Sequence, residues 1–295
     1  MTPASYSPSQ TRLFSRCPYK WYIEKYLHLR PSILGKRDLA ACVGTAVGAA
    51  LATYYKHNRQ VEYSTLVGLA QDRYQQEVET HIKAGRSIYD EETAIAYSGY
   101  PLTLLNEYMK NESDHIPADF TVTDVESRMC ETHESYIDIG GTCDRGRWIA
   151  DFKCRMNVKP GSVEAELNKY AFDSQLLQYV DEYQKKTNQP VAFYRIIMLV
   201  AAPKPMVRWQ DFEVSQHVVN ARAASNTRIW SDIHVATQWL AALDVLDRHA
   251  RTAVVEAVPM AADHYDGIFK CEYTDVCFGD YESPADSGTL INIGR

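Results

Sequence analysis

An apolar segment from Val191 to Ala201 is the feature that most constrains the fold of this chain. Apolar strands of this kind are typical of sheets covered on both faces, so the segment predicts a buried strand. The following segment, Val207 to Val214, alternates apolar and polar residues, as a strand with one exposed face does. Together the two segments predict a layered core in which helices cover a sheet.

Three segments upstream also have strand character, because they are rich in β-branched or aromatic residues and are separated by Gly or polar turns. They predict a meander over Phe120–Met129, Ser135–Cys143 and Arg147–Cys154. Helical spacing marks most of the remainder, namely Pro8–Arg16, Tyr19–Leu27, Leu39–Met109, Val163–Lys186 and Gln216–Glu256. We therefore expect an α/β fold with a central mixed sheet, in a single domain. Its parts are a mainly helical segment (1–116), a β-rich core (117–214), and C-terminal helices with a cysteine-containing tail (215–295).

The charge balance limits how this chain could contact nucleic acid. The formal net charge is -7 and the pI is near 5.7, so long-range repulsion opposes the approach of a polyanion to most of the surface. Contact would need a local basic patch, and Arg12, Arg16 and Lys20 lie in one near the N-terminus. Aromatic residues interleave with these cations, which favours binding of single-stranded nucleic acid, although such aromatics more often pack against a sheet.

The sequence predicts neither export nor a membrane span. The N-terminus lacks the charged segment and apolar run of a secretory signal. The longest weakly polar stretch, Ala40–Ala52, is shorter than the roughly 20 residues that a helix needs to cross a bilayer. We therefore expect a cytoplasmic protein without a membrane partner.

The densest group of reactive side chains lies between Gly140 and Lys153. Asp151 and Lys153 are two residues apart on a predicted strand, so their side chains project from the same face. Asp144 precedes a tight turn and is expected to fold back beside them. Two neighbouring carboxylates repel unless a cation lies between them, and oxygen-rich sites of this kind suit Mg²⁺ or Mn²⁺. With a lysine to orient an attacking water, the set meets the requirements of phosphodiester hydrolysis.

These residues resemble the active-site hairpin of the PD-(D/E)XK nuclease superfamily, in which a first acid, a second acid and a lysine occur together. The resemblance extends to Gln175 and Tyr179, which match the Gln-x-x-x-Tyr helix of the RecB-like and CRISPR-associated exonuclease branch. Spaced four apart, both face the same side of one helix. The resemblance assigns them to the active-site wall and to DNA contact, and it implies a restriction-endonuclease-like fold.

The same resemblance implies further metal-binding groups. The main-chain carbonyl of Phe152 would complete the shell of a Mg²⁺ or Mn²⁺ ion bound by the two acids. Glu126 falls on the preceding strand, where such proteins often carry an acid. The chain departs from the pattern at one position: relatives have a metal-binding histidine four residues after a glycine in the first long helix, whereas here Gly44 is followed by Gly48.

The segment from 7 to 22 resembles the opening of the same branch, whose cysteine is the first ligand of an iron-sulfur staple. Cys17 holds that position. The remaining ligands in that branch come from a C-terminal cysteine triplet, and this chain offers His264, Cys271 and Cys277 instead. The set predicts a [4Fe-4S] cluster or a tetrahedral Zn²⁺ ion that ties the two termini together, and the alternative is ordinary buried thiols.

We therefore expect a metal-dependent nuclease that hydrolyses DNA phosphodiester bonds as an exonuclease, on single strands or duplex ends. A protein partner in a repair, recombination or genome-processing complex belongs to this interpretation. A site-specific endonuclease would use the same chemistry. The alternative from a different class is a catalytically silent module that binds nucleic acid or a protein, and the glycine at position 48 raises that alternative.

Overall fold

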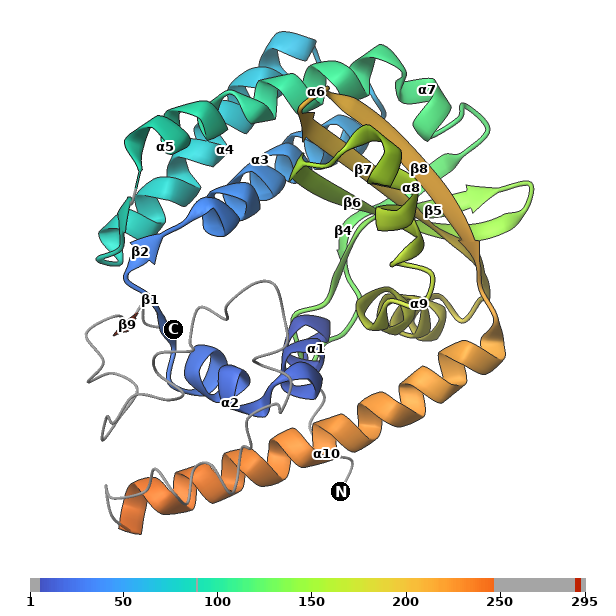
Figure 1. Ribbon diagram of the computed structural model, residues 1–295. Helices are drawn as coiled ribbons and strands as arrows, with labels where there is room; N and C mark the ends of the chain where they lie inside the picture. Colours follow the sequence, from blue (N-terminus) through green and yellow to red (C-terminus); the bar gives the residue numbers. More distant parts are fainter. Residues whose placement is uncertain (1–5, 89, 247–289, 293–295) are drawn as a thin grey trace. The chain divides into compact units, whose positions relative to one another are not determined.

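The computed structural model describes residues 6–88, 90–246 and 290–292 (Figure 1). The chain divides into two compact units. Unit 1 comprises Met1–Ile33, His81–Ser87 and Ala223–Arg295, and unit 2 comprises Leu34–Thr80 and Ile88–Arg222. The single domain expected from the sequence stays a prediction. None of the helices within the described residues is both long enough and apolar enough to span a bilayer.

Unit 2 is built on a five-stranded sheet with the strand order β4-β5-β6-β7-β8. Its strands are β4 (Thr121–Arg128), β5 (Tyr136–Cys143), β6 (Gly146–Asn157), β7 (Val191–Ala202) and β8 (Met206–Glu213). β6 and β7 are parallel, and the other neighbours are antiparallel. The mixed sheet and the α/β fold expected from the sequence are therefore confirmed.

Helices cover both faces of this sheet (Figure 1). Phe193, Ile197 and Leu199 of β7 pack into a core that contains buried residues of α3 (Lys36–Lys56), α4 (Tyr63–Lys83) and α6 (Tyr100–Lys110). Tyr194 and Ile196 of the same strand pack into a second core with α8 (Val163–Asn168) and α9 (Ser174–Thr187). The strand is thus buried on both faces, which explains its apolar sequence. We call these two sides of the sheet the α3 face and the α9 face.

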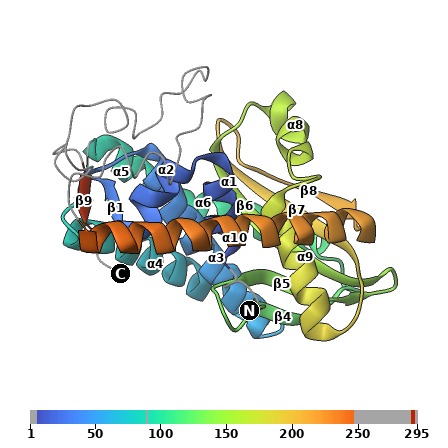
Figure 2. The same cartoon turned by 90° about the horizontal axis from the view of Figure 1, so that it is seen from below.

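The remaining elements of unit 2 are short. They are α5 (Glu91–Ser98), α7 (Glu112–His115) and the 3-10 turn η2 (Pro160–Ser162). Figure 2 shows α8 beside the β7–β8 side of the sheet, away from the helices of the α3 face. One glycine is required by close packing: a Cβ atom at Gly141 of β5 would lie 1.8 Å from the main-chain oxygen of Thr121. The register of β4 against β5 shifts nearby, between Val122 and Asp124.

Unit 1 begins with α1 (Pro8–Arg16), α2 (Pro18–Trp21) and the π-helical turn η1 (Tyr22–Tyr26). The Ser7 hydroxyl caps α1 by accepting a hydrogen bond from the main-chain N–H of Gln10 at 3.4 Å. β1 (Leu29–Pro31) pairs with β9 (Leu290–Asn292), and β2 (Ile33–Leu34) pairs with β3 (Ser87–Ile88). The long helix α10 (Gln216–Leu246), which belongs to unit 1 from Ala223 onward, confirms the helical segment expected after Gln216. Positions 247–256 of that prediction lie outside the described residues.

Candidate active site

Two carboxylates meet on neighbouring strands on the α9 face of the sheet. The β5–β6 ladder ends at the pair Ile139 and Ala150, and Asp138 and Asp151 are the next residues on the two strands. A carboxylate oxygen of Asp138 accepts a hydrogen bond from the main-chain N–H of Phe152 at 2.6 Å. Burial, together with the charge of Asp151, raises the pKa of Asp138 to about 7. The two acids therefore stand close enough for their charges to oppose each other.

Lys153 completes this group from the same strand as Asp151. Its Nζ atom lies 2.6 Å from Oδ2 of Asp151, and both side chains are largely buried. Burial disfavours the ammonium form, but the charges of Asp151 and Asp138 outweigh burial and raise the pKa of Lys153. The Tyr170 ring centre lies 5.9 Å from the same nitrogen. The alternation of β6 thus brings Asp151 and Lys153 together as the sequence predicted.

The position predicted for Asp144 is wrong. Cys143 pairs with Gly146, so Asp144 lies in the two-residue turn between β5 and β6, where its side chain is exposed. Asp151 is five residues further along β6 than Gly146, or roughly 16 Å at a rise of about 3.3 Å per residue. The acid beside Asp151 is Asp138, which the sequence alone did not identify. The register of a hairpin with a two-residue Asp-Arg turn was the signal that could have identified it.

One wall of the site comes from α9. Nε2 of Gln175 donates a hydrogen bond to the Tyr179 hydroxyl at 2.8 Å, so the two side chains share one helix face as predicted. Burial and the nearby charge of Asp151 raise the pKa of Tyr179. This helix face is therefore turned toward the acids. Asp173 fixes the start of α9 by accepting a hydrogen bond from the main-chain N–H of Gln175 at 2.8 Å.

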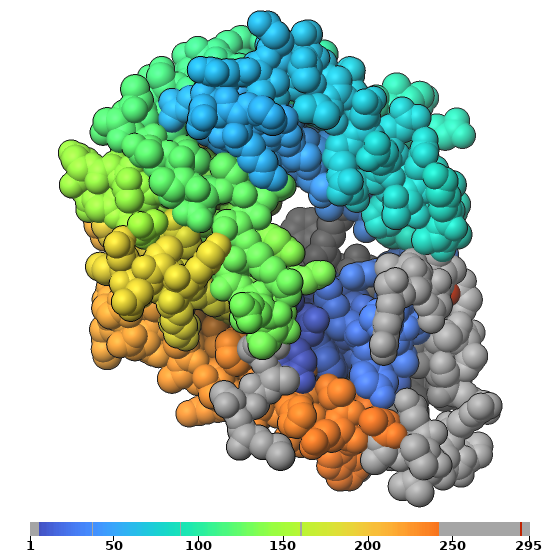
Figure 3. All heavy atoms as spheres, turned by 180° about the vertical axis from the view of Figure 1, so that it is seen from behind, coloured from blue at the N-terminus to red at the C-terminus, as the bar shows by residue number. Residues whose placement is uncertain are grey.

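The second half of α9 is hydrogen-bonded to the β4–β5 hairpin. Glu182 is hydrogen-bonded to Nε2 of His133 at 2.9 Å, accepts a hydrogen bond from Gln178 at 2.7 Å, and accepts another from the Ser135 hydroxyl. In Figure 3, the yellow atoms of α9 lie against the green atoms of this hairpin. Ser135 immediately precedes β5, so these bonds help to fix the strand that carries Asp138.

The described residues provide some of the ligands that a divalent cation needs. Oδ2 of Asp151 is buried and, apart from its ion pair with Lys153, has no hydrogen-bond partner among the described residues. Together with the neighbouring acid Asp138, it offers the carboxylate oxygens that Mg²⁺ and Mn²⁺ prefer. No group of three or more His, Cys, Asp or Glu side chains within the described residues is arranged to hold a metal ion. Any further ligands must come from main-chain carbonyl groups, such as that of Phe152, or from water.

Two further positions bear on the predicted metal site, namely Glu126 and Gly48. Glu126 lies on β4 at a positive φ of 43°, and its carboxylate is 2.9 Å from Nζ of Lys56 at the end of α3. It contributes, after burial and Asp151, to the raised pKa of Asp138. A Cβ atom at Gly48 would meet nothing within 4 Å, so α3 has open space at the position where the resemblance implied a histidine.

The basic patch and the staple involve unit 1, and both stay predictions. Arg16 is exposed, whereas Arg12 and Lys20 are half-buried, and Nζ of Lys20 lies 3.4 Å from the carboxylate of Glu24. Cys17 is buried between α1 and α2. The other predicted staple ligands, His264, Cys271 and Cys277, lie outside the described residues. The pairing of β1 with β9 nevertheless joins N- and C-terminal segments within this unit.

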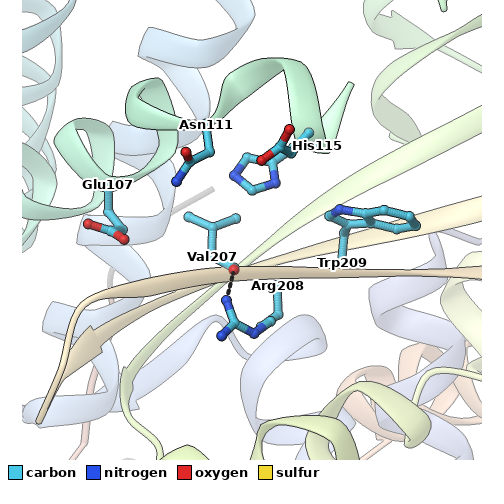
Figure 4. Close-up of a pocket in the computed structure, with 7 residues that line it drawn as sticks. Glu107, Asn111, His115, Val207, Arg208 and Trp209 are labelled. Carbon is cyan, nitrogen blue, oxygen red and sulfur yellow. Dashed lines mark hydrogen bonds between the residues drawn. The ribbon is translucent and has the colours of Figure 1, made fainter. Parts of the chain in front are cut away.

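A pocket of about 340 Å³ lies away from the acids, between α6, α7 and β8 (Figure 4). None of Asp138, Asp151 and Lys153 lines it. Its lining includes His115, which is 5% exposed and whose two ring nitrogens have no hydrogen-bond partner among the described residues. Burial lowers the pKa of His115, although the nearby Asp114 opposes the shift. The imidazole is therefore neutral near pH 7.

His115 should make the fold sensitive to acid. A histidine whose pKa is lower in the folded state than its unfolded value of 6.5 stabilises the fold fully above that value. Its contribution is lost as the pH falls below 6.5, because the unfolded chain binds the proton first. We expect His115→Phe to lose less thermal stability than the parent between pH 7.5 and pH 5.5. Melting curves of both proteins at these pH values test this, and equal losses would contradict it.

Comparison with known proteins identifies the family of this chain. The sequence model of the PD-(D/E)XK nuclease superfamily matches residues 5–278. No curated protein matches the sequence significantly. Among solved structures, the crystal structure of LHK-Exo in complex with dAMP shows 11% identity and a TM-score of 0.31, over 70% of this chain and 96% of that one. That structural likeness is too weak to support a conclusion. With a family match over nearly the whole sequence, this chain belongs to the PD-(D/E)XK nuclease superfamily.

Proposed function

We propose that this protein is a metal-dependent deoxyribonuclease that acts as an exonuclease on single strands or duplex ends. The observation that carries the proposal is the group formed by Asp138, Asp151 and Lys153 on one face of β5 and β6. Family membership supports a nuclease, and the buried acid pair supports the need for a divalent cation. Asp138 takes the place that the sequence predicted for Asp144.

In this proposal each side chain has its own role in hydrolysis. Asp138 and Asp151 would hold Mg²⁺ or Mn²⁺, and the main-chain carbonyl of Phe152 would be a further ligand. When bound, the ion neutralises charge on the phosphate and activates water. Lys153 orients the attacking water and, as an ammonium group in a buried site, stabilises the negative charge that develops. Gln175 forms part of the wall that contacts the substrate, held there by its hydrogen bond to the Tyr179 hydroxyl.

Metal removal and DNA topology test this function directly. We expect the purified protein to degrade end-labelled linear DNA in Mg²⁺ or Mn²⁺, to stop in EDTA, and to leave covalently closed circles intact, because an exonuclease needs an end. Loss of label over time, with Asp151→Asn purified in parallel as a control for contaminating nucleases, provides the measurement. Cleavage of closed circles would indicate an endonuclease instead. Binding without turnover at any metal concentration would favour the silent module that Gly48 suggests.

A further inference from the structure

An arginine that has no acidic partner among the described residues lies on the same face of β6 as the candidate catalytic group. Arg155 is two residues beyond Lys153, so strand alternation places their side chains on one face. Its guanidinium donates hydrogen bonds to the Tyr170 hydroxyl and to the main-chain oxygen of Cys154, and it forms no ion pair within the described part of the chain. A guanidinium has five N–H donors, so three remain for a ligand. A half-buried cation with unused N–H donors is suited to binding an anion.

An exposed aromatic ring lies in the loop that follows Tyr170, the hydrogen-bond partner of this arginine. Phe172 is 71% exposed, although the loop that carries it is held on both sides. On one side, the Tyr194 hydroxyl donates to the main-chain oxygens of Tyr170 and Ala171 at 2.9 and 2.7 Å. On the other side, Asp173 caps α9. The ring is therefore presented to solvent by a fixed backbone, which lowers the entropy lost when a flat ligand stacks on it.

Tyr170 links both residues to the candidate catalytic lysine. Its hydroxyl accepts the hydrogen bond from Arg155, and its ring centre is 5.9 Å from Nζ of Lys153. Phe172 follows only two residues later, at most about 7 Å along the chain. A guanidinium with unused donors and the loop that carries an exposed ring are thus both joined to the site through Tyr170. A strand of nucleic acid offers a phosphate and a base at successive positions along its length.

We propose that Arg155 and Phe172 form a subsite for the nucleotide next to the scissile phosphate. Arg155 binds the flanking phosphate, and Phe172 stacks on the base. The inference rests on the proposed function, because it places a nucleic-acid strand across β6. Stacking on an aromatic ring tolerates every base, so the subsite favours unpaired nucleotides without selecting a sequence.

Binding measurements separate the two contacts. Fluorescence anisotropy with a labelled single-stranded oligonucleotide, on the Asp151→Asn protein in Mg²⁺, gives an affinity at several salt concentrations without degradation. Arg155→Gln should reduce the slope of log affinity against log salt by about 0.7, the value for one phosphate contact with a single strand. Phe172→Ala should weaken binding about 5- to 150-fold and leave that slope unchanged. An abasic oligonucleotide of equal length should remove the effect of Phe172→Ala only.

Control variants test whether losing any cation or any exposed apolar side chain changes binding. Arg73→Gln removes a cation from α4, which packs on the α3 face, and Ile95→Ala removes an apolar side chain that is 72% exposed. Neither should change affinity or slope. Arg155→Lys keeps the charge and should restore the slope, which a folding defect would not do. Melting curves confirm that each variant is folded.

The outcomes are distinct from those that test the function. Unchanged affinity in Phe172→Ala, an unchanged slope in Arg155→Gln, or no oligonucleotide binding by the Asp151→Asn protein would each overturn the subsite. If the parent protein cleaves no DNA but the two variants change binding as expected, the proposed function fails, while Arg155 and Phe172 still form a nucleotide-binding subsite. If the parent cleaves DNA but the variants bind as the parent does, the subsite fails while the proposed function stands.

Discussion

Asp138→Asn is expected to lower the rate of DNA cleavage by at least about 100-fold, whereas Asp144→Asn should leave the rate within about twofold. Asparagine is close in size to aspartate, and its oxygen can still accept the hydrogen bond from the main-chain N–H of Phe152. The fold is therefore retained, but the negative charge that would bind a divalent ion beside Asp151 is lost. Single-turnover degradation of labelled linear DNA, measured across a range of Mg²⁺ concentrations, gives the comparison.

The pair of variants also decides between two assignments of the first acid. Asp151→Asn serves as the inactive reference, since both assignments include that residue. A change in the metal concentration needed for half-maximal rate should accompany any residual activity of Asp138→Asn, because one metal ligand is lost. Full activity in Asp138→Asn together with loss of activity in Asp144→Asn would overturn the assignment made from the strand register.

The sequence was sufficient to predict the layers of unit 2. The apolar segment around Ile196 and Met198 predicted a strand that is buried on both faces. Short β-branched segments bounded by turns identified the remaining strands. These patterns depend on local chemistry, which a single sequence contains. The division of the chain into two units could not be read in this way, because unit 1 combines segments far apart in the sequence. Pairing between β1 and β9 is an example of such a distant contact.

The candidate site was predicted in part for a related reason. Asp151 and Lys153 share one strand, and Gln175 and Tyr179 share one helix, so their spacing fixes which faces they occupy. The partner of Asp151 lies on another strand, and its identity depends on the register across a turn. If the turn is assumed to lie at a different position, the acid placed beside Asp151 becomes Asp144 in place of Asp138. The exposed ring of Phe172 gave no sequence signal, because its exposure follows from how the loop is held.

The second large effect concerns stability and the buried residue Arg195 of β7. The residue is 2% exposed, and its guanidinium donates to both carboxylate oxygens of Asp211 at 2.6 and 2.9 Å and to the main-chain oxygen of His115 at 2.6 Å. It also stacks on Trp209 at 4.1 Å. We expect Arg195→Met to lower the free energy of unfolding by about 3 to 5 kcal/mol, because a largely buried carboxylate loses two of its hydrogen-bond donors and a carbonyl loses its donor. Urea denaturation followed by circular dichroism measures this.

Arg145 provides the matched control because it binds the same carboxylate from a different environment. Its Nη1 atom lies 2.5 Å from Oδ2 of Asp211, but its side chain is 40% exposed in the turn between β5 and β6. Water can replace that contact, so Arg145→Met should cost less than about 1 kcal/mol. Equal losses in the two variants would show that burial does not set the strength of this pair. A much larger loss for Arg195→Met would show that the interior guanidinium holds β7 and β8 to the segment that carries His115.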